Sequence, residues 1–185
     1  MKKKRPLTIL EDGVGDGLAA RDIKEYIKNS TVYDSTNKPV FLSKSDLPHI
    51  TGITLKASKN TKFEKKQGTL NEVHQTMGEF FVPKKPVDLI ISTYGSIHYT
   101  AFPLLQDHLL KFVHALKKEG LMLAVFDPSS RTNANIVDMA QWNREIKYIR
   151  QNTTPIERKF AKMGFKAKIF ENESNQFVII VQRLR

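Results

Sequence analysis

The sequence contains no cysteine, so disulfide bonds and thiolate metal ligands are both excluded. It also lacks any apolar run near the roughly 18 residues that a membrane-spanning helix needs. The basic residues 1–5 precede only a short apolar run that ends at Glu11, which does not fit a secretory signal peptide. The histidines other than His98 show no metal-ligand spacing with carboxylates, so nothing supports a metal centre. These absences favour a cytoplasmic protein that works without a metal.

The composition is that of an ordinary globular protein with a strongly basic balance. With 185 residues, 40% hydrophobic and 26% charged, residues 1–185 are expected to form a single domain. The net charge of +11 indicates either a solubilising surface or attraction to an anionic partner. The basic residues are spread over several runs, including residues 56–66, and no stacking aromatics are evident near them. A nucleic acid is therefore not the favoured partner.

A glycine-rich run over residues 11–17 carries most of the information in the chain. It follows the apolar pair Ile9 and Leu10 and precedes an amphipathic stretch over residues 18–23. Glycine tolerates positive φ and lets a ligand approach the backbone, and the first N–H groups of the following helix face such a ligand. The alternative is a plain strand-to-helix turn without a ligand.

The spacing of this run is E-x-G-x-G-x-G, which differs from the dinucleotide fingerprint G-x-G-x-x-G. It resembles the cofactor loop of class I S-adenosylmethionine-dependent methyltransferases. The resemblance implies that Glu11 contacts the amino group of S-adenosylmethionine, directly or through water. It also implies that Gly13, Gly15 and Gly17 pass beneath the methionine part of this cofactor.

Strand and helix patterns alternate along the chain. Strands are expected at residues 7–10, 49–55, 72–81, 87–92, 121–126, 165–171 and 176–184. Helices are expected at residues 18–28, 102–120, 136–150 and 154–164, and residues 56–68 form either a helix or a loop. This order predicts an α/β fold, a Rossmann-like three-layer sandwich. Its mostly parallel seven-stranded sheet is closed by a C-terminal antiparallel hairpin, as in class I methyltransferases.

Two boundaries within this pattern rest on local signals. Gly120 is expected to stop the helix that begins near residue 102, with Lys117 and Lys118 in its last turn. Thr154 and Pro155 are expected to begin a separate helix, as a cap followed by proline at the first helical position.

The resemblance places further cofactor contacts at the next two strands. The family usually ends its second strand with an acid that binds the ribose hydroxyls. If residues 50–55 are that strand, Thr54 takes the place of the acid, whereas an alignment on residues 32–35 assigns Asp34. We favour Thr54, because residues 32–33 are too short for a central strand. Glu79 lies where the family contacts the adenine amino group, and the alternative is an ordinary surface glutamate.

Residues 88–98 resemble the family's fourth motif, so Ser92, Thr93 and Tyr94 are expected to line the methyl-transfer site. Ser92 and Thr93 are expected to contact the cofactor, and Tyr94 is a candidate catalytic residue. His98 is a candidate general base because its ordinary pKa lies near neutrality. Alternatively, His98 caps a helix or packs. The sequence lacks the Asn-Pro-Pro-Tyr motif of adenine and glutamine N-methylating members, which argues against those substrates.

The resemblance also shows what is missing from the start of the chain. Many family members carry N-terminal helices that cover the substrate, so here a cover is expected from residues 29–48, residues 127–150 or a partner. We predict an S-adenosylmethionine-dependent methyltransferase that acts on a small molecule or a protein side chain. The alternatives are a non-catalytic cofactor-binding or interaction module with the same fold and, less favoured, a nicotinamide-binding domain.

Overall fold

The protein is built around one large sheet. The computed structural model describes residues 5–30, 32–33, 37–40, 43–76, 78–93, 95–99, 102–126, 139–174 and 176–185. The strands of the main sheet are β1 (Thr8–Asp12), β4 (His49–Thr54), β5 (Glu72–Gln75), β6 (Val87–Thr93), β7 (Leu116–Phe126), β8 (Phe165–Glu171) and β9 (Phe177–Arg183). The α-helices are α1 (Leu18–Asn29), α2 (Lys59–Lys66), α3 (Ser96–Tyr99), α4 (Phe102–His114) and α6 (Met139–Lys162). Shorter elements are β2 (Val32–Tyr33), β3 (Pro39–Val40) and the 3-10 helices η1 (Lys44–Asp46) and η2 (Gly78–Phe80).

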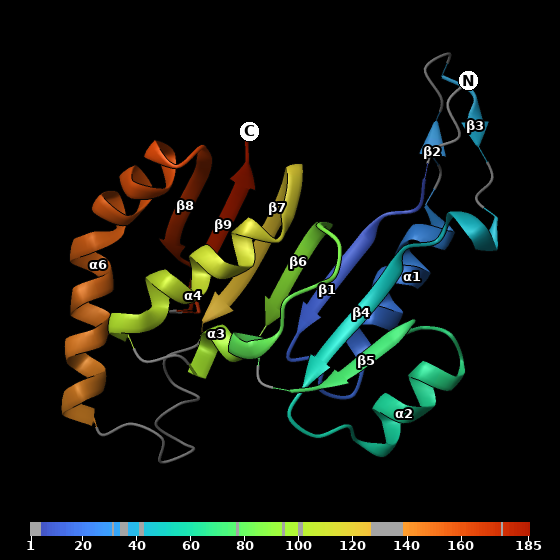
Figure 1. Cartoon of the computed structure of the whole chain (residues 1–185), viewed down its shortest axis with the longest axis horizontal. Helices are drawn as coiled ribbons and strands as arrows, with labels where there is room; N and C mark the ends of the chain where they lie inside the picture. Colours follow the sequence, from blue (N-terminus) through green and yellow to red (C-terminus); the bar gives the residue numbers. More distant parts are fainter. Residues whose placement is uncertain are drawn as a thin grey trace.

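The order of strands in the sheet is β5-β4-β1-β6-β7-β9-β8 (Figure 1). The first five strands run parallel, and β9 is antiparallel to both of its neighbours. The predicted sheet, mostly parallel and closed by an antiparallel hairpin, is therefore confirmed. The choice of residues 49–55 as the second central strand is confirmed as well, because β4 pairs directly with β1.

Helices cover both faces of this sheet and bury two separate apolar clusters. Neighbouring residues of β1 face opposite sides, so Ile9 joins the cluster that contains Ala20 of α1, while Leu10 joins the larger cluster. That larger cluster includes Phe112 of α4 and Phe160 of α6. Figure 1 shows α1 behind β1 and β4, and α4 in front of β7. The three-layer sandwich is confirmed, and no helix in the described part of the chain is long and apolar enough to cross a membrane.

The helix before β7 ends six residues earlier than the sequence suggests. It stops at His114, and Gly120 lies inside β7 rather than at a helix end, so that prediction was wrong. Between the pairs Val87–Leu116 and Leu89–Leu121, β7 has more residues than β6, which makes residues 117–120 a bulge. Glu119 has a positive φ of 65° within this bulge.

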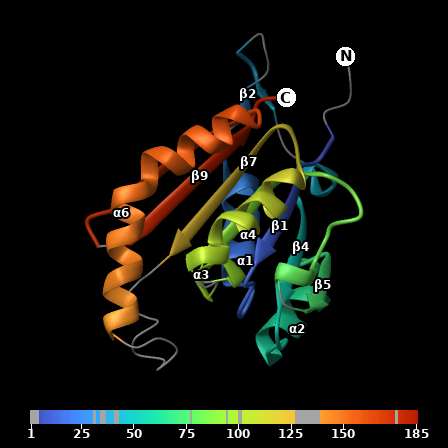
Figure 2. The same ribbon diagram turned by 60° about the vertical axis from the view of Figure 1, so that its left-hand side comes forward.

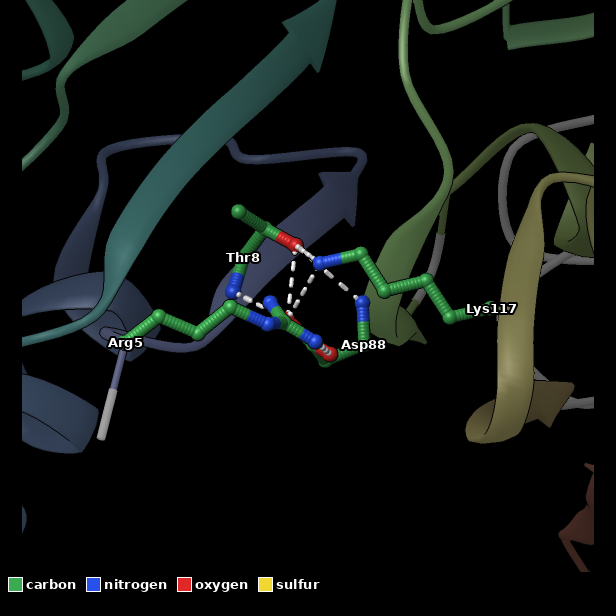
Figure 3. A network of polar contacts seen from close by, with 4 residues as sticks. All are labelled: Arg5, Thr8, Asp88 and Lys117. Carbon is green, nitrogen blue, oxygen red and sulfur yellow. Dashed lines mark hydrogen bonds and ion pairs between the residues drawn. The ribbon is translucent and has the colours of Figure 1, made fainter. Parts of the chain in front are cut away.

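Four residues from three separate stretches of the sequence join the amino-terminal ends of β1, β6 and β7 (Figure 3). The carboxylate of Asp88 accepts bonds from both terminal nitrogens of Arg5 at 3.0 and 2.7 Å, and from the backbone N–H of Thr8 at 2.7 Å. The Oγ1 of Thr8 and the Nζ of Lys117 donate to the same carboxylate at 2.8 and 2.9 Å. Partial burial alone would raise the pKa of Asp88, but these bonds hold it well below its ordinary value. The bulge in β7 thus presents Lys117 to Asp88.

The helix α6 runs without interruption from Met139 to Lys162, with Pro155 inside it. The prediction of a separate helix starting at Thr154 was therefore wrong. Proline removes one backbone hydrogen bond and typically bends a helix, and Figure 2 shows that α6 changes direction along its length. The helix continues because Ile149, Ile156 and Phe160 form one buried stripe across the proline. Each such side chain contributes roughly 1.5–3 kcal/mol when buried.

The described residues between 29 and 48 lie away from the carboxyl ends of the strands (Figure 1). In its described part, β2 pairs with β3 in a small sheet of its own. Figures 1 and 2 both place this small sheet beyond the opposite, amino-terminal ends of β1 and β4. Of the three expected sources of a cover, the described part of residues 29–48 therefore does not supply it, and residues 127–138 lie outside the described residues.

Candidate functional site

The glycine loop joins the end of β1 to the start of α1. Gly13, Gly15 and Gly17 have φ values of 81°, 50° and 79°, a left-handed region that side chains with a Cβ rarely adopt. The backbone N–H groups of Gly13 and Val14 both donate to the carbonyl of Ile53 at 3.0 Å. The loop is thereby fixed to the end of β4, at the carboxyl edge where open α/β sheets bind ligands.

Two of these glycines have different surroundings. A Cβ on Gly15 would meet only the carbonyl oxygen of Gly13, at 3.8 Å, so the space beside it is open. A Cβ on Gly17 would lie 3.1–3.2 Å from side-chain atoms of Glu64 and Leu70. Gly17 is therefore required for packing under α2, whereas Gly15 borders space that a ligand can use.

Glu11 is a buried acid with one carboxylate oxygen that has no partner among the described residues. Only 5% of the residue is exposed, and its Oε2 atom has no hydrogen-bond partner among the described residues. Burial raises the pKa of this carboxyl to about 7. A buried carboxylate is stable only when a cation or hydrogen-bond donor compensates it. A cation or a hydrogen-bond donor beside the glycine loop would compensate the carboxylate of Glu11.

The next residue, Asp12, organises the turn that follows β6. Its Oδ2 atom accepts hydrogen bonds from the Oγ of Ser92 at 2.7 Å, the backbone N–H of Ser96 at 2.7 Å and the Oγ of Ser96 at 2.8 Å. The Oγ of Ser96 also lies 3.1 Å from the Nε2 of the buried His108 on α4. Asp12 was missed in the sequence, where the only signal was a second acid at a position that a buried strand normally fills with an apolar residue.

Glycines allow two further turns to approach Asp12. A Cβ on Gly95 would lie 2.3 Å from the carbonyl oxygen of Asp12, and one on Gly78 would lie 2.4 Å from its Oδ1. Neither distance leaves room for a side chain. The turns after β1, β5 and β6 therefore converge on a single carboxylate.

The structure distributes the remaining candidate residues unevenly. Thr54 is half-buried at the end of β4, where its Oγ1 donates to the carbonyl of Lys56 at 3.2 Å. Ser92 is fully buried and donates to Asp12, whereas Thr93 is exposed at the end of β6. Tyr94 and the alternative ribose residue Asp34 lie outside the described residues.

Two other candidates are described in backbone only. Glu79 belongs to η2 and His98 to α3, so both lie on the turns that follow the carboxyl ends of β5 and β6. No group of three or more His, Asp and Glu side chains is placed to hold a metal ion in the part of the chain that the structure describes.

A separate hollow lies on the sheet surface away from the glycine loop. The described part of the connection from β5 to β6 contains η2 but no α-helix. Residues 81–86 of this connection border a cavity of about 580 Å³, whose other lining residues include Leu10, His49, Thr51 and His74. None of the loop glycines lines this cavity, so it is distinct from the candidate cofactor site.

Comparisons with known proteins define the fold. No model of a known protein family and no curated protein matches the sequence. A protein of Clostridium thermocellum described as an rRNA-methylase superposes with a TM-score of 0.59 at 10% identity, covering 98% of this chain and 89% of that one. A plantazolicin methyltransferase in complex with S-adenosylhomocysteine gives 0.59 at 14% identity, covering 100% of this chain and 78% of that one.

A third solved structure widens the range of acceptors among these proteins. It is the 1,6-didemethyltoxoflavin-N1-methyltransferase of Burkholderia thailandensis with 1,6-didemethyltoxoflavin and S-adenosylhomocysteine bound. Its TM-score is 0.55 at 9% identity, covering 98% of this chain and 72% of that one. The chain therefore has the fold of the class I S-adenosylmethionine-dependent methyltransferases, as the glycine spacing predicted.

Proposed function

We propose that this chain is an S-adenosylmethionine-dependent methyltransferase whose residues 1–185 form a single domain. The observation that carries the proposal is the buried, unpartnered Oε2 atom of Glu11 beside the glycine loop. The amino group of S-adenosylmethionine is cationic and would compensate this carboxylate. The open space beside Gly15 supports the same assignment, because a ligand can approach the backbone there.

The other cofactor contacts follow the carboxyl edge of the sheet. Gly13, Gly15 and Gly17 would lie beneath the methionine part of the cofactor. Thr54 would contact the ribose with a neutral hydroxyl, and Glu79 would contact the adenine amino group. A neutral hydroxyl forms a weaker bond than an ionised acid, so this arrangement makes Glu11 the main polar contact.

The acceptor would enter beside the turn after β6. When bound, the cofactor supplies a sulfonium-activated methyl group for in-line transfer to a nucleophile. Thr93 would contact the cofactor and Tyr94 would orient that nucleophile. His98 would accept the proton of the nucleophile where it carries one. Ser92 would act through Asp12, because its hydroxyl donates to that carboxylate. The structural neighbours act on different classes of acceptor, so we retain the small molecule or protein side chain that the sequence favours.

A second candidate function is a non-catalytic module that binds the cofactor or another protein. The observation that favours it is Thr54, which stands where the family usually has an acid. Its hydroxyl already donates to the backbone carbonyl of Lys56. Transfer of label from methyl-labelled S-adenosylmethionine to RNA, protein or small molecules of a cell extract separates the two. Cofactor binding without any transfer would support the module.

Calorimetry tests the cofactor assignment directly. S-adenosylmethionine and S-adenosylhomocysteine are expected to bind, whereas NAD is not. Glu11→Gln should weaken binding of S-adenosylhomocysteine by about 10- to 100-fold, the value of one hydrogen bond to a charged group. Glu25→Gln on the exposed side of α1 is the matched control and should leave affinity unchanged. Binding of NAD alone, or of none of the three, would refute the proposal.

A further inference from the structure

The outer face of α2 combines positive charge with an exposed aromatic ring. Lysines 59, 62, 65 and 66 are all exposed, and Lys56 precedes the helix by three residues. None of these five side chains forms an ion pair with a described residue. The one acid of the helix, Glu64, is buried and lies 3.7 Å from Arg21, so it does not neutralise the outer face.

Phe63 lies in the middle of these lysines. It is 56% exposed, although phenylalanine is usually buried. Helical spacing places Lys59, four residues before it, and Lys66, three residues after it, on the same face. Leu55, directly after β4, is 72% exposed. No aromatic ring was expected to be available among the basic runs, and the structure corrects that expectation.

We infer that this face of α2 binds single-stranded nucleic acid. The lysines would neutralise backbone phosphates, and the ring of Phe63 would stack on a base. A single strand fits better than a duplex, because the bases of a duplex are already stacked and paired. The inference concerns a partner and stands apart from cofactor binding.

The small apolar area on the outer face of α2 disfavours a membrane as the partner. An interfacial helix inserts a wide apolar face between lipids. The inner face of α2 packs against the protein through Thr61 and Glu64, which leaves Phe63 as the one apolar residue on its outer face. One aromatic ring surrounded by lysines is suited to base stacking but supplies little area for insertion.

The position of α2 relates this surface to the candidate cofactor site. Ser58, the N-cap of α2, donates to the carboxylate of Asp16 at 2.6 Å, and Thr61 donates to the carbonyl of Gly15. The helix is therefore bonded to the glycine loop. The strand-binding face of α2 is turned away from this loop, because Thr61 and Glu64 occupy the side of the helix that contacts it.

Fluorescence anisotropy with labelled RNA and DNA single strands of about 12 nucleotides tests the inference without any cofactor. The protein is expected to bind them at about 50 mM salt, more tightly than it binds a duplex of the same sequence, and to lose affinity at about 200 mM. Replacing lysines 59, 62, 65 and 66 by Gln should reduce the salt slope by about 2 to 3. The matched control replaces four exposed lysines elsewhere, at positions 111, 147, 162 and 166, and should change the slope far less.

A substitution at Phe63 distinguishes stacking on a base from insertion into a lipid bilayer. Phe63→Leu keeps apolar area but removes the aromatic ring, so strand affinity should fall by about tenfold. Flotation with phosphatidylserine vesicles provides the comparison, because Phe63→Leu would leave binding to lipid largely intact. Binding to vesicles but not to strands, equal loss in the two lysine variants, or no strand binding at low salt would each overturn the inference. Heats of S-adenosylhomocysteine binding should be the same in all these variants, which keeps this test independent of the proposed function.

Discussion

The Oγ–H of Ser92 donates a 2.7 Å hydrogen bond to the carboxylate of Asp12, 80 residues earlier in the chain. The two residues lie directly opposite each other on β6 and β1, and both are buried. Because Ser96 donates to the same oxygen from the following turn, this bond connects the centre of the sheet to the loop that carries the candidate acceptor residues.

Loss of this carboxylate should destabilise the turn. We expect Asp12→Asn to lower the free energy of unfolding by about 1.5–3 kcal/mol, since hydrogen bonds to a charged acceptor are worth that much. Asp12→Ala should cost more, because it also leaves buried hydroxyls unpaired. Chemical denaturation measures both. A double-mutant cycle with Ser92→Ala should show a coupling of about 1 kcal/mol, and strict additivity would show that the two side chains do not interact.

Glu11 should make the unliganded protein less stable as pH rises. Its pKa is about 7 in the folded state against an ordinary value of 4.5, so between these values the folded state holds a proton that the unfolded chain has lost. The contribution of protonated Glu11 to the free energy of unfolding is complete below about pH 4.5. It is lost as pH rises through 7, and the total loss is about 3 kcal/mol. Glu11→Gln should remove this dependence. Denaturation of both proteins at pH 5 and 8 measures the difference, and parallel curves would contradict the assignment.

The same ionisation should control ligand affinity in the opposite direction. A cationic amino group binds the ionised form of Glu11, so affinity for S-adenosylhomocysteine should rise by roughly an order of magnitude from pH 6 to pH 7.5. In Glu11→Gln the affinity should be lower and nearly constant over this range. Calorimetry at several pH values provides the measurement, and an affinity that falls as pH rises would exclude this contact.

Gly15 and Gly17 should respond differently to the same substitution. Gly15→Ala adds a side chain in open space at positive φ, which costs about 1–2 kcal/mol of stability but intrudes on the ligand. Gly17→Ala has similar backbone strain and also crowds Glu64 and Leu70, so its loss of stability should be larger. Thermal unfolding with and without S-adenosylhomocysteine distinguishes them. The first variant should lose the shift produced by the ligand, and the second should retain it if it folds.

The assignment of the ribose position has its own test. Thr54→Asp should maintain or improve affinity for S-adenosylhomocysteine, because an ionised acid forms a stronger bond to a hydroxyl than threonine does. Thr54→Asn is the uncharged control of similar shape and should not improve it. Asp34→Ala should have little effect, and a large loss there would transfer the ribose contact to Asp34.

Local patterns predicted most of the fold because strand and helix patterns alternate along the chain and the glycine loop has a distinctive spacing. The two helix boundaries that were predicted wrongly, at Gly120 and Pro155, share a physical cause. Gly120 and Pro155 carry strong local signals for a helix end and a helix start, yet tertiary contacts override both. Lys117 is held by Asp88, 29 residues away, and Ile156 lies on a buried stripe that continues past Pro155. Neither contact can be read from a short window of sequence.

In the candidate site, too, some features could be predicted from local sequence and others depend on tertiary contacts. The acid at Glu11 was predicted from its spacing to the glycines, but its missing hydrogen-bond partner depends on what surrounds it after folding. Asp12 was not predicted, because its partners belong to β6 and α3. Phe63 was overlooked as an aromatic among the lysines because its exposure depends on which face of α2 packs against the glycine loop.

The cluster around Asp88 has a consequence for how the chain folds. Its bonds connect Asp88 with Arg5 across 83 residues, with Thr8 across 80 and with Lys117 across 29. Such contacts form only when three strands are already aligned, and contacts of long sequence separation are slow to form. The cluster should therefore be absent from the folding transition state, so that Asp88→Asn accelerates unfolding while leaving the refolding rate nearly unchanged. The contacts at the amino-terminal edge of the sheet would then form last during folding, and they would set the unfolding rate and so the lifetime of the folded protein.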